Sequence, residues 1–331
     1  MIRVLVTHPS DKLEQYFGRR ALNALNSFAN VKLNPLAQEL ATDALIDLAK
    51  DCDALIAYRQ TPAPSTLFSA LPRLSAFLRC AVDIRTVDVP AASRHGVLVT
   101  QASPGFGPAV TEWILAVMVD LARGITDYAS AYHRGELPLP QMGRQLSGAT
   151  LGVIGHGVIG QRVASLGLAL GMQVLVHTLE EIDERDGRRA VSLDELLSNS
   201  DFVVCLAPAN AATENLMDAR AFDAMKRGTY FINASRGELV HEEALLAALD
   251  SGHLAGCALD VGRAPDQMPL PRLAKHSRVI ASPHIGGLTP EATEHQAMET
   301  VVQLQSLVRG ELPRGAVNPE HALRWKSWSR P

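Results

Sequence analysis

Residues 151–160 read Leu-Gly-Val-Ile-Gly-His-Gly-Val-Ile-Gly, and this stretch decides the fold prediction for the chain. The apolar residues before the glycines predict a strand from Thr150 to Ile154, and the pattern after them predicts a helix from Val158 to Leu170. At this spacing the first glycine permits a tight turn, the second lets backbone approach a ligand, and the third packs helix on strand. The helix amino terminus then favours an anion such as a pyrophosphate. The alternative, a glycine turn that binds nothing, fits the flanking strand and helix less well. We therefore predict a dinucleotide site formed by Gly155, His156, Gly157, Val158, Ile159 and Gly160.

At the position that usually binds the ribose of the dinucleotide, this chain has Thr178 instead of an acidic residue. An acid at the end of the second strand, about 20 residues on, would bind the ribose hydroxyls of NAD. Here the predicted strand Gln173 to His177 is followed by Thr178, which would tolerate a 2′-phosphate. Glu180 and Glu181 would repel that phosphate, and no arginine is adjacent in the sequence. We predict NAD as the cofactor with Thr178 in its site, and NADP stays open.

Short apolar runs alternate with longer segments of helical period on both sides of this turn, which predicts an α/β fold with parallel sheets. Turn-forming residues crowd positions 101–108, so we place a domain boundary there. A helix predicted from Thr111 to Arg123 is apolar on every side, which indicates burial in a core or against a second subunit. Thr289 and Pro290 offer an N-cap and a first-turn proline for a helix that runs to about Val308. The predicted strands include 54–57, 77–82, 150–154, 173–177 and 279–281.

Composition argues against several other classes of protein. The 331 residues carry a formal net charge of −4, so no overall attraction to nucleic acid or to an anionic membrane is expected. No run of 18 apolar residues predicts a membrane span. The four cysteines are dispersed, and no two histidines have the spacing of a ligand pair on one helix face, so we expect neither a disulfide framework nor a metal site. The first residues predict a strand and a turn rather than a signal peptide, and we expect a cytoplasmic location.

Further motifs resemble those of the D-isomer-specific 2-hydroxyacid dehydrogenases, a family that includes phosphoglycerate, D-lactate and glyoxylate or hydroxypyruvate enzymes. They lie at 145–154, 199–204 together with Pro208 and Thr213, 233–237 (Asn-Ala-Ser-Arg-Gly), 259–261 (Leu-Asp-Val) and 282–287 (Ser-Pro-His-Ile-Gly-Gly). The resemblance implies two Rossmann-like domains with parallel sheets. It implies a discontinuous substrate domain of residues 1–103 and 288–331, and an inserted dinucleotide-binding domain of residues 104–287. It also implies a homodimer built around the helix 111–123.

The chemistry of that family explains the residue types. Oxidising a 2-hydroxy acid removes a hydride from carbon and a proton from the hydroxyl, so the protein must supply a proton carrier and a cation for the carboxylate. His284 is the catalytic candidate for the proton, and Arg236 is the catalytic candidate for the carboxylate. The resemblance assigns substrate binding to Val82, Asp83, Arg236 and His284. It extends the cofactor site to Ala207, Pro208, Thr213, Ala234, Ser235, Arg236, Asp260, His284 and Gly286.

Two places depart from the family's pattern. Family members carry a Glu five residues after the counterpart of Asp260, and position 265 here is Pro. Either Ala264 occupies the Glu position, or Asp266 supplies the carboxylate from a reshaped loop; we include Asp266 among the catalytic candidates, with a solvated loop residue as the alternative. The substrate-domain turn, glycine-rich in the family, reads Ala-Val-Asp-Ile-Arg-Thr-Val-Asp over residues 81–88.

The sequence thus predicts an oxidoreductase that transfers hydride between a nicotinamide cofactor and a small D-2-hydroxy acid or 2-oxo acid. One alternative is a non-catalytic NAD(H)-sensing scaffold of the corepressor type, which the missing Glu favours. A second is an NADP-preferring reductase of a bulkier 2-oxo acid.

Overall fold

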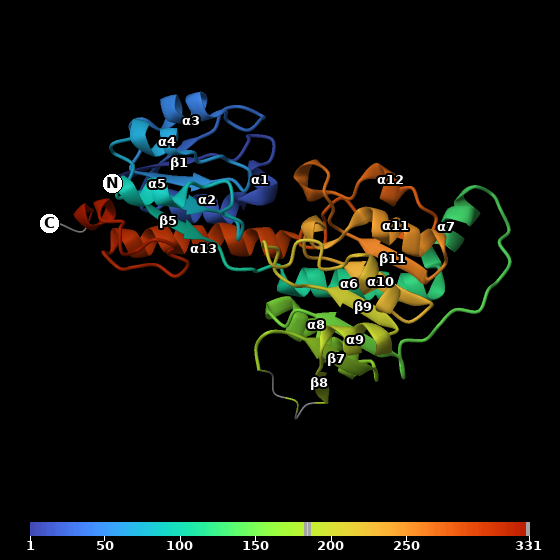
Figure 1. The fold of residues 1–331 in the computed structure, drawn as a ribbon. Helices are drawn as coiled ribbons and strands as arrows, with labels where there is room; N and C mark the ends of the chain where they lie inside the picture. Colours follow the sequence, from blue (N-terminus) through green and yellow to red (C-terminus); the bar gives the residue numbers. More distant parts are fainter. Residues whose placement is uncertain (182–183, 185–186, 329–331) are drawn as a thin grey trace. The chain divides into compact units, whose positions relative to one another are not determined.

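The chain folds into two compact units, and the computed structural model describes residues 1–181, 184 and 187–328 of it (Figure 1). Unit 1 comprises Met1–Phe106 and Thr289–Pro331, and unit 2 comprises Gly107–Leu288. Each unit is built on a parallel sheet flanked by helices. The predicted α/β class with two Rossmann-like parallel-sheet domains is therefore confirmed.

The sheet of unit 1 has the strand order β2-β1-β3-β4-β5, and its strand pairs are parallel. Its elements are β1 (Ile2–Val6), α1 (Leu13–Tyr16), α2 (Gly18–Asn26), β2 (Ala29–Leu33), α3 (Thr42–Ala49), β3 (Ala54–Ala57), α4 (Ser65–Ala70), β4 (Ala76–Arg79), α5 (Val89–Arg94), β5 (Leu98–Gln101), α13 (Pro290–Val308) and a 3-10 turn at Arg324–Ser327.

Successive side chains of these strands enter two different cores, because strand residues alternate between the faces of a sheet. Val4 and Ile56 face a core that includes residues of α2 and α13. Leu5 and Leu55 face a second core that includes residues of α3, α4 and α5. Helix α13 begins as predicted, because the Thr289 side chain accepts the backbone N–H of Ala292.

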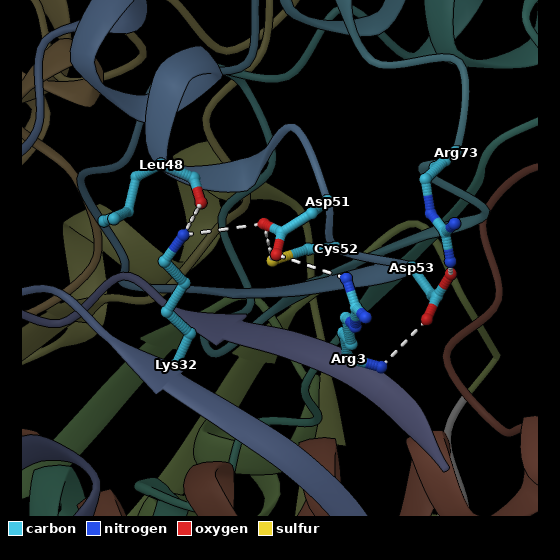
Figure 2. Close-up of polar contacts among 7 residues, drawn as sticks. All are labelled: Arg3, Lys32, Leu48, Asp51, Cys52, Asp53 and Arg73. Atoms are coloured by element: carbon cyan, nitrogen blue, oxygen red, sulfur yellow. Dashed lines mark hydrogen bonds and ion pairs between the residues drawn. The ribbon is translucent and has the colours of Figure 1, made fainter.

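Charged side chains form hydrogen bonds and ion pairs at the amino ends of β3 and β4 (Figure 2). The Asp53 carboxylate accepts the backbone N–H of Arg3 and an N–H of the Arg73 guanidinium, each at 2.8 Å. Lys32 Nζ donates to the carbonyl oxygen of Leu48 at 2.7 Å and lies 3.5 Å from the Asp51 carboxylate. These contacts tie β1, β2 and the end of α3 to the start of β3.

The sheet of unit 2 has the strand order β12-β11-β10-β9-β6-β7-β8, and its strand pairs are also parallel. Its elements are α6 (Gly107–Arg123), α7 (Ile125–His133), β6 (Thr150–Ile154), α8 (Val158–Ala169), β7 (Gln173–His177), β8 (Arg188–Ala190), α9 (Leu193–Asn199), β9 (Phe202–Cys205), α10 (Ala219–Ala224), β10 (Thr229–Asn233), a 3-10 turn at Gly237–Leu239, α11 (Glu242–Asp250), β11 (Leu254–Leu259), a 3-10 turn at Pro265–Gln267, α12 (Pro271–Ala274) and β12 (Val279–Ala281).

The core of unit 2 packs helices closely on the sheet. Residues of α9, α10 and α11, among them Leu196, Phe222 and Leu245, share one buried cluster with strand residues such as Phe231. Asp201, directly before β9, is buried and accepts from Lys226 Nζ at 2.5 Å and from the backbone N–H of Thr150 at 2.9 Å. Burial opposes ionisation of Asp201, but these hydrogen bonds and the positive charge of Arg144, 2.6 Å away, lower the pKa of its carboxyl.

Several predicted elements have different bounds in the structure. The predicted strand 77–82 ends at Arg79, because residues 80–82 form a bend, in which Cys80 and Ala81 are buried, rather than pairing in the sheet. The predicted helix 111–123 begins earlier, at Gly107, since Pro108 lies in its first turn, where a missing N–H costs nothing. Within the described part of the chain, none of the helices combines the length and the apolarity that crossing a membrane requires.

Candidate functional site in the second unit

The glycine turn predicted from residues 155–160 connects β6 to α8. Gly155 has a left-handed φ of 98°, and a Cβ there would lie 2.7 Å from the backbone of Leu206, so only glycine fits. A Cβ on Gly160 would overlap the carbonyl oxygen of Gly155. A Cβ on Gly157, in contrast, would meet none of the described residues within 4 Å.

This open space lies at the amino terminus of α8, where Gly157 is the N-cap and no side chain of the described part of the chain caps the helix. The backbone N–H groups of the first turn are directed toward that space, and the helix dipole adds positive potential there. The space and the donors fit the pyrophosphate of a dinucleotide. Val158 is half exposed at the same end.

A histidine–arginine contact adjoins the turn. The Arg188 guanidinium lies 3.0 Å from His156 Nε2, and because a guanidinium only donates, His156 Nε2 accepts. Burial and the positive charge of Arg188 lower the pKa of His156, and the carboxylate of Glu180 partly opposes them. Sequence reasoning missed Arg188, because it lies 32 residues from His156 and enters the region from β8. Thr178, directly after β7, accepts the backbone N–H of Glu180 at 3.3 Å.

The candidate catalytic residues follow neighbouring strands of the same sheet. The register pairs Asn233 with Leu259 and Leu259 with Ala281, so the carboxyl ends of β10, β11 and β12 align. Arg236 comes three residues after the first of these ends, and His284 comes three residues after the last. Open α/β sheets bind ligands at this edge.

Asn233 shapes the loop that carries Arg236. Its side-chain amide donates to the carbonyl oxygen of Arg236 at 2.9 Å, and its side-chain oxygen accepts the N–H of Ser235 at 3.1 Å. The Ser235 hydroxyl in turn donates to the carbonyl oxygen of Ala207 at 2.6 Å. These bonds bring the predicted residues Ala207, Ala234, Ser235 and Arg236 into one loop cluster. Arg236 is half-buried and Nη1 donates to the carbonyl oxygen of Ser235 at 2.7 Å.

The turn that carries His284 is held by one buried carboxylate. Asp260 is 3% exposed and accepts the Ser282 hydroxyl at 2.6 Å, the N–H of Ile285 at 2.8 Å and the N–H of Gly286 at 2.7 Å. His284 has a left-handed φ of 56°, which is uncommon for a residue other than glycine. The carboxylate therefore stabilises a strained backbone conformation at the candidate proton carrier.

A tight loop after β11 packs on the arginine loop. A Cβ on Gly237 would overlap the backbone of Gly262, and a Cβ on Gly262 would lie 2.5 Å from Pro269. Arg263, from the same loop, donates to the Glu214 carboxylate at 2.8 Å. The backbone of Asp266 lies in the 3-10 turn Pro265–Gln267, and its side chain is outside the part that the structure describes.

The remaining predicted cofactor residues form the loop after β9. Thr213 donates its hydroxyl to the carbonyl oxygen of Pro208 at 2.7 Å, and the same hydroxyl accepts the N–H of Asn210 at 2.9 Å. The loop thus folds back on itself beside Ala207. Val82 and Asp83, the predicted substrate-binding residues, lie in unit 1 after β4.

The cysteines do not contribute a nucleophile to this chemistry, since all four are buried free thiols. Burial raises the pKa of Cys52 to about 11, and raises those of Cys80 and Cys205 to about 12. A thiol with such a pKa is protonated and inert at neutral pH.

Comparisons with known proteins point to one family. A model described as "D-isomer specific 2-hydroxyacid dehydrogenase, NAD binding domain" matches residues 115–286. The D-3-phosphoglycerate dehydrogenase of Synechocystis sp. is 33% identical over 322 residues, which cover 96% of this chain and 56% of that protein. The chain spans about half the length of the curated relatives it matches.

Solved structures agree in fold over nearly the whole chain. D-lactate dehydrogenase from Aquifex aeolicus, complexed with NAD and lactic acid, has a TM-score of 0.78 and 25% identity, with 96% of this chain and 97% of that chain covered. A glyoxylate reductase from Paecilomyes thermophila has a TM-score of 0.83 and 26% identity, with 96% and 99% covered. The family model matches more than half of the chain and includes the glycine turn and the loops of Arg236 and His284, so the chain belongs to the D-isomer specific 2-hydroxyacid dehydrogenase family.

Proposed function

We propose that the chain transfers a hydride between a nicotinamide dinucleotide and a small 2-oxo acid or D-2-hydroxy acid. The observation that carries the proposal is the shared carboxyl edge of the unit 2 sheet. The open glycine turn follows β6 there, Arg236 follows β10, and His284 follows β12 in a turn fixed by Asp260. These groups supply an anion site, a cation and a proton carrier, which the reaction requires.

The bound nicotinamide supplies the hydride in reduction and accepts it in oxidation. Arg236 binds the substrate carboxylate through its planar guanidinium, and its charge stabilises the carbonyl oxygen as negative charge develops on that atom. His284 donates a proton to this oxygen during reduction and removes the hydroxyl proton during oxidation. In this proposal Asp266 is the acid that orients His284 in place of the family's Glu.

The proposal assigns substrate binding in unit 1 to the turn that contains Val82 and Asp83. The Asp83 carboxylate is paired with Arg85, which donates from Nη2 at 2.8 Å and from its backbone N–H at 2.9 Å. Because this pair neutralises the acid, the turn does not repel an anionic substrate as an isolated carboxylate would.

The proposal also includes NAD as the cofactor, a homodimer and a cytoplasmic location. The negative charge of Glu180 beside His156 disfavours the extra phosphate of NADP. Helix α6 carries apolar residues that are only half-buried, including Trp113, Leu115, Val119 and Leu121, and a second subunit would cover them. Four free cysteines suit a reducing compartment.

The test is to follow the absorbance of NADH and NADPH with glyoxylate, hydroxypyruvate, pyruvate, phosphohydroxypyruvate and longer 2-oxo acids. We expect turnover with at least one acid. His284→Asn should reduce turnover by about 10² to 10⁴-fold while NADH still binds, and Arg236→Lys should weaken both substrate affinity and rate because the planar fork is lost. NADH binding without turnover of any acid would instead support the scaffold.

A further inference from the structure

Arg79, the last residue of β4, is a fully buried arginine in unit 1. Nη1 donates to the carbonyl oxygens of Tyr58 and Arg59 at 2.7 and 2.8 Å. Nη2 donates to the carbonyl oxygen of Thr61 at 2.9 Å and to the Thr86 hydroxyl at 2.8 Å. One guanidinium therefore joins the loop after β3 to the turn after β4.

The positive charge of Arg79 is not balanced by a hydrogen-bonded carboxylate among the described residues. Its four acceptors are neutral oxygens, and Nε is buried without a hydrogen-bond partner in the described structure. Burial lowers the pKa of Arg79 to about 10, against a smaller opposing effect of Asp83, so the group is still charged at neutral pH. A buried charge is costly unless an opposite charge compensates it. An anionic ligand bound near the carboxyl end of β4 would compensate the charge of Arg79.

The same two loops are linked by backbone contacts, which Arg79 completes. The N–H of Ala63 donates to the carbonyl oxygen of Thr86 at 3.0 Å, and the N–H of Asp88 donates to that of Ala63 at 2.9 Å. The Thr61 hydroxyl bonds the hydroxyl of Thr7, at the end of β1, at 2.7 Å. The turn of residues 81–88 is thus anchored at its far end by backbone contacts with Ala63, and Arg79 adds a side-chain bond to Thr86 at that same end.

The sequence of this turn suits a clamp made by side chains. Residues 81–88 contain no glycine, so the turn has less backbone freedom to lose than a glycine-rich loop, and a few contacts suffice to hold it. Arg79 provides four such contacts directly before the turn begins.

We propose that Arg79 is a positioning residue: it holds the loops 58–61 and 81–87 so that the backbone of Val82 and Asp83 receives the carboxylate of a 2-oxo acid. This inference rests on the proposed function. Arg79 acts through the turn and does not touch the reacting atoms, so it should affect substrate affinity more than the rate at saturation.

The test compares Arg79→Met, which removes the charge and the donors, with Arg79→Lys, which keeps the charge but cannot reach four acceptors. Arg73→Met is the control, since Arg73 is an exposed arginine of the same unit that pairs with Asp53. We measure kcat and KM for the best 2-oxo acid, NADH affinity by fluorescence, and amide hydrogen exchange of residues 58–61 and 81–87.

We expect faster exchange in both loops and a loss of about 10²-fold in kcat/KM for Arg79→Met, mostly through KM, with a smaller loss for Arg79→Lys. NADH affinity and the Arg73→Met variant should match wild type. If Arg79→Met does not fold, Arg79→Lys gives the same comparison. An unchanged KM in a variant whose loops exchange faster would overturn this inference alone, whereas a wild-type chain inactive with every acid would overturn the proposed function as well.

Discussion

The carboxylate of Asp260 accepts the backbone N–H of Gly286 at 2.7 Å, across 26 residues of sequence. The same carboxylate accepts the Ser282 hydroxyl and the N–H of Ile285, so His284 lies in the sequence between residues that Asp260 holds. These three hydrogen bonds stabilise the left-handed conformation of His284. Gly286 cannot be replaced without disturbing this arrangement, because a Cβ there would lie 2.8 Å from the Asp260 carboxylate. The geometry of the candidate proton carrier therefore depends on a residue at the end of another strand.

Asp260→Asn should reduce turnover while leaving the cofactor bound. One carboxylate oxygen becomes an amide that cannot accept, so a buried backbone N–H loses its partner at a cost of about 1–3 kcal/mol in the free energy of unfolding. The loosened His284 turn should lower kcat by roughly 10²-fold. Stopped-flow kinetics and NADH fluorescence measure the two effects. Asp218→Asn is the control, because Asn caps helix α10 as well as Asp does. Normal turnover in a destabilised Asp260→Asn variant would limit Asp260 to a structural role.

Gly157→Val should fold normally and lose dinucleotide binding. The backbone at Gly157 is extended, with φ −71° and ψ −165°, and a Cβ there meets no described atom within 4 Å, so the fold tolerates the side chain. The added methyl groups would fill the space offered to the pyrophosphate. NADH titration and thermal unfolding separate the two effects. Gly160→Val is the contrasting variant, since its side chain would overlap the carbonyl of Gly155 and should destabilise the unit itself.

Asp266→Asn tests which acid serves His284. If Asp266 supplies the carboxylate, the substitution removes the charge that favours the protonated imidazole, and the alkaline limb of the reductive pH–rate profile should move to lower pH. Activity should then fall most at alkaline pH and least at acid pH. An unmoved profile would leave Arg236 and His284 to act as a pair. Glu214→Gln, in a neighbouring loop, controls for the loss of an acid near Arg263.

NADH should bind more tightly than NADPH. The Arg188 guanidinium is already engaged by His156, and the Glu180 carboxylate acts on the same imidazole, so a 2′-phosphate would meet negative charge in this region. Fluorescence titration of both cofactors measures the preference, and Arg188→Ala should change NADH affinity only a few-fold. A wild-type preference for NADPH that disappears in Arg188→Ala would show that Arg188 binds the phosphate instead.

Acid should destabilise unit 1 through His8. This histidine is buried against Phe17 and Tyr58, and burial lowers its pKa from 6.5 to about 3. Below pH 6.5 the unfolded chain therefore binds a proton at His8 that the folded chain does not bind. The contribution of His8 to stability is fully present above pH 6.5 and is lost progressively as the pH falls toward 3. Each pH unit below 6.5 lowers the free energy of unfolding by about 1.4 kcal/mol.

Urea denaturation at pH 7 and pH 5, followed by tryptophan fluorescence, measures this effect. His8→Leu, of similar volume and without charge, should reduce the loss of unfolding free energy between the two pH values by about 2 kcal/mol. His133→Leu is the control, because His133 is exposed at the end of α7. The same loss in His8→Leu as in wild type would assign the acid sensitivity to other groups.

Strong periodic segments made much of the fold predictable. The strands Thr150–Ile154, Gln173–His177 and Val279–Ala281 have their predicted bounds, as does the helix that begins at Pro290. The edge strands β2 and β8 were not predicted, because β2 contains Lys and β8 contains two arginines and is only three residues long. The apolar run after Phe77 predicted burial correctly but not strand, since Cys80 and Ala81 are buried in a turn.

The site was predictable where a motif is local and hidden where a contact spans the chain. The glycine turn and the strand-end positions of Arg236 and His284 follow from short patterns. The contacts of Asp260 with residues 282–286, of Arg188 with His156 and of Arg79 with Tyr58 join residues 21 to 32 positions apart, so no local pattern signals them. The assigned catalytic, cofactor and substrate residues stay predictions until the variants are measured.

The ion pairs at the amino ends of the strands have a consequence for the evolution of the protein. In unit 1 Asp53 pairs with Arg73, and in unit 2 Asp201 pairs with Lys226, while the candidate site residues follow the carboxyl ends of strands. Substitutions at the amino ends adjust stability without touching the carboxyl ends, where the candidate site residues lie. Tolerance to heat or salt can therefore be selected without altering the candidate site, and a directed-evolution library could treat these two groups of positions separately.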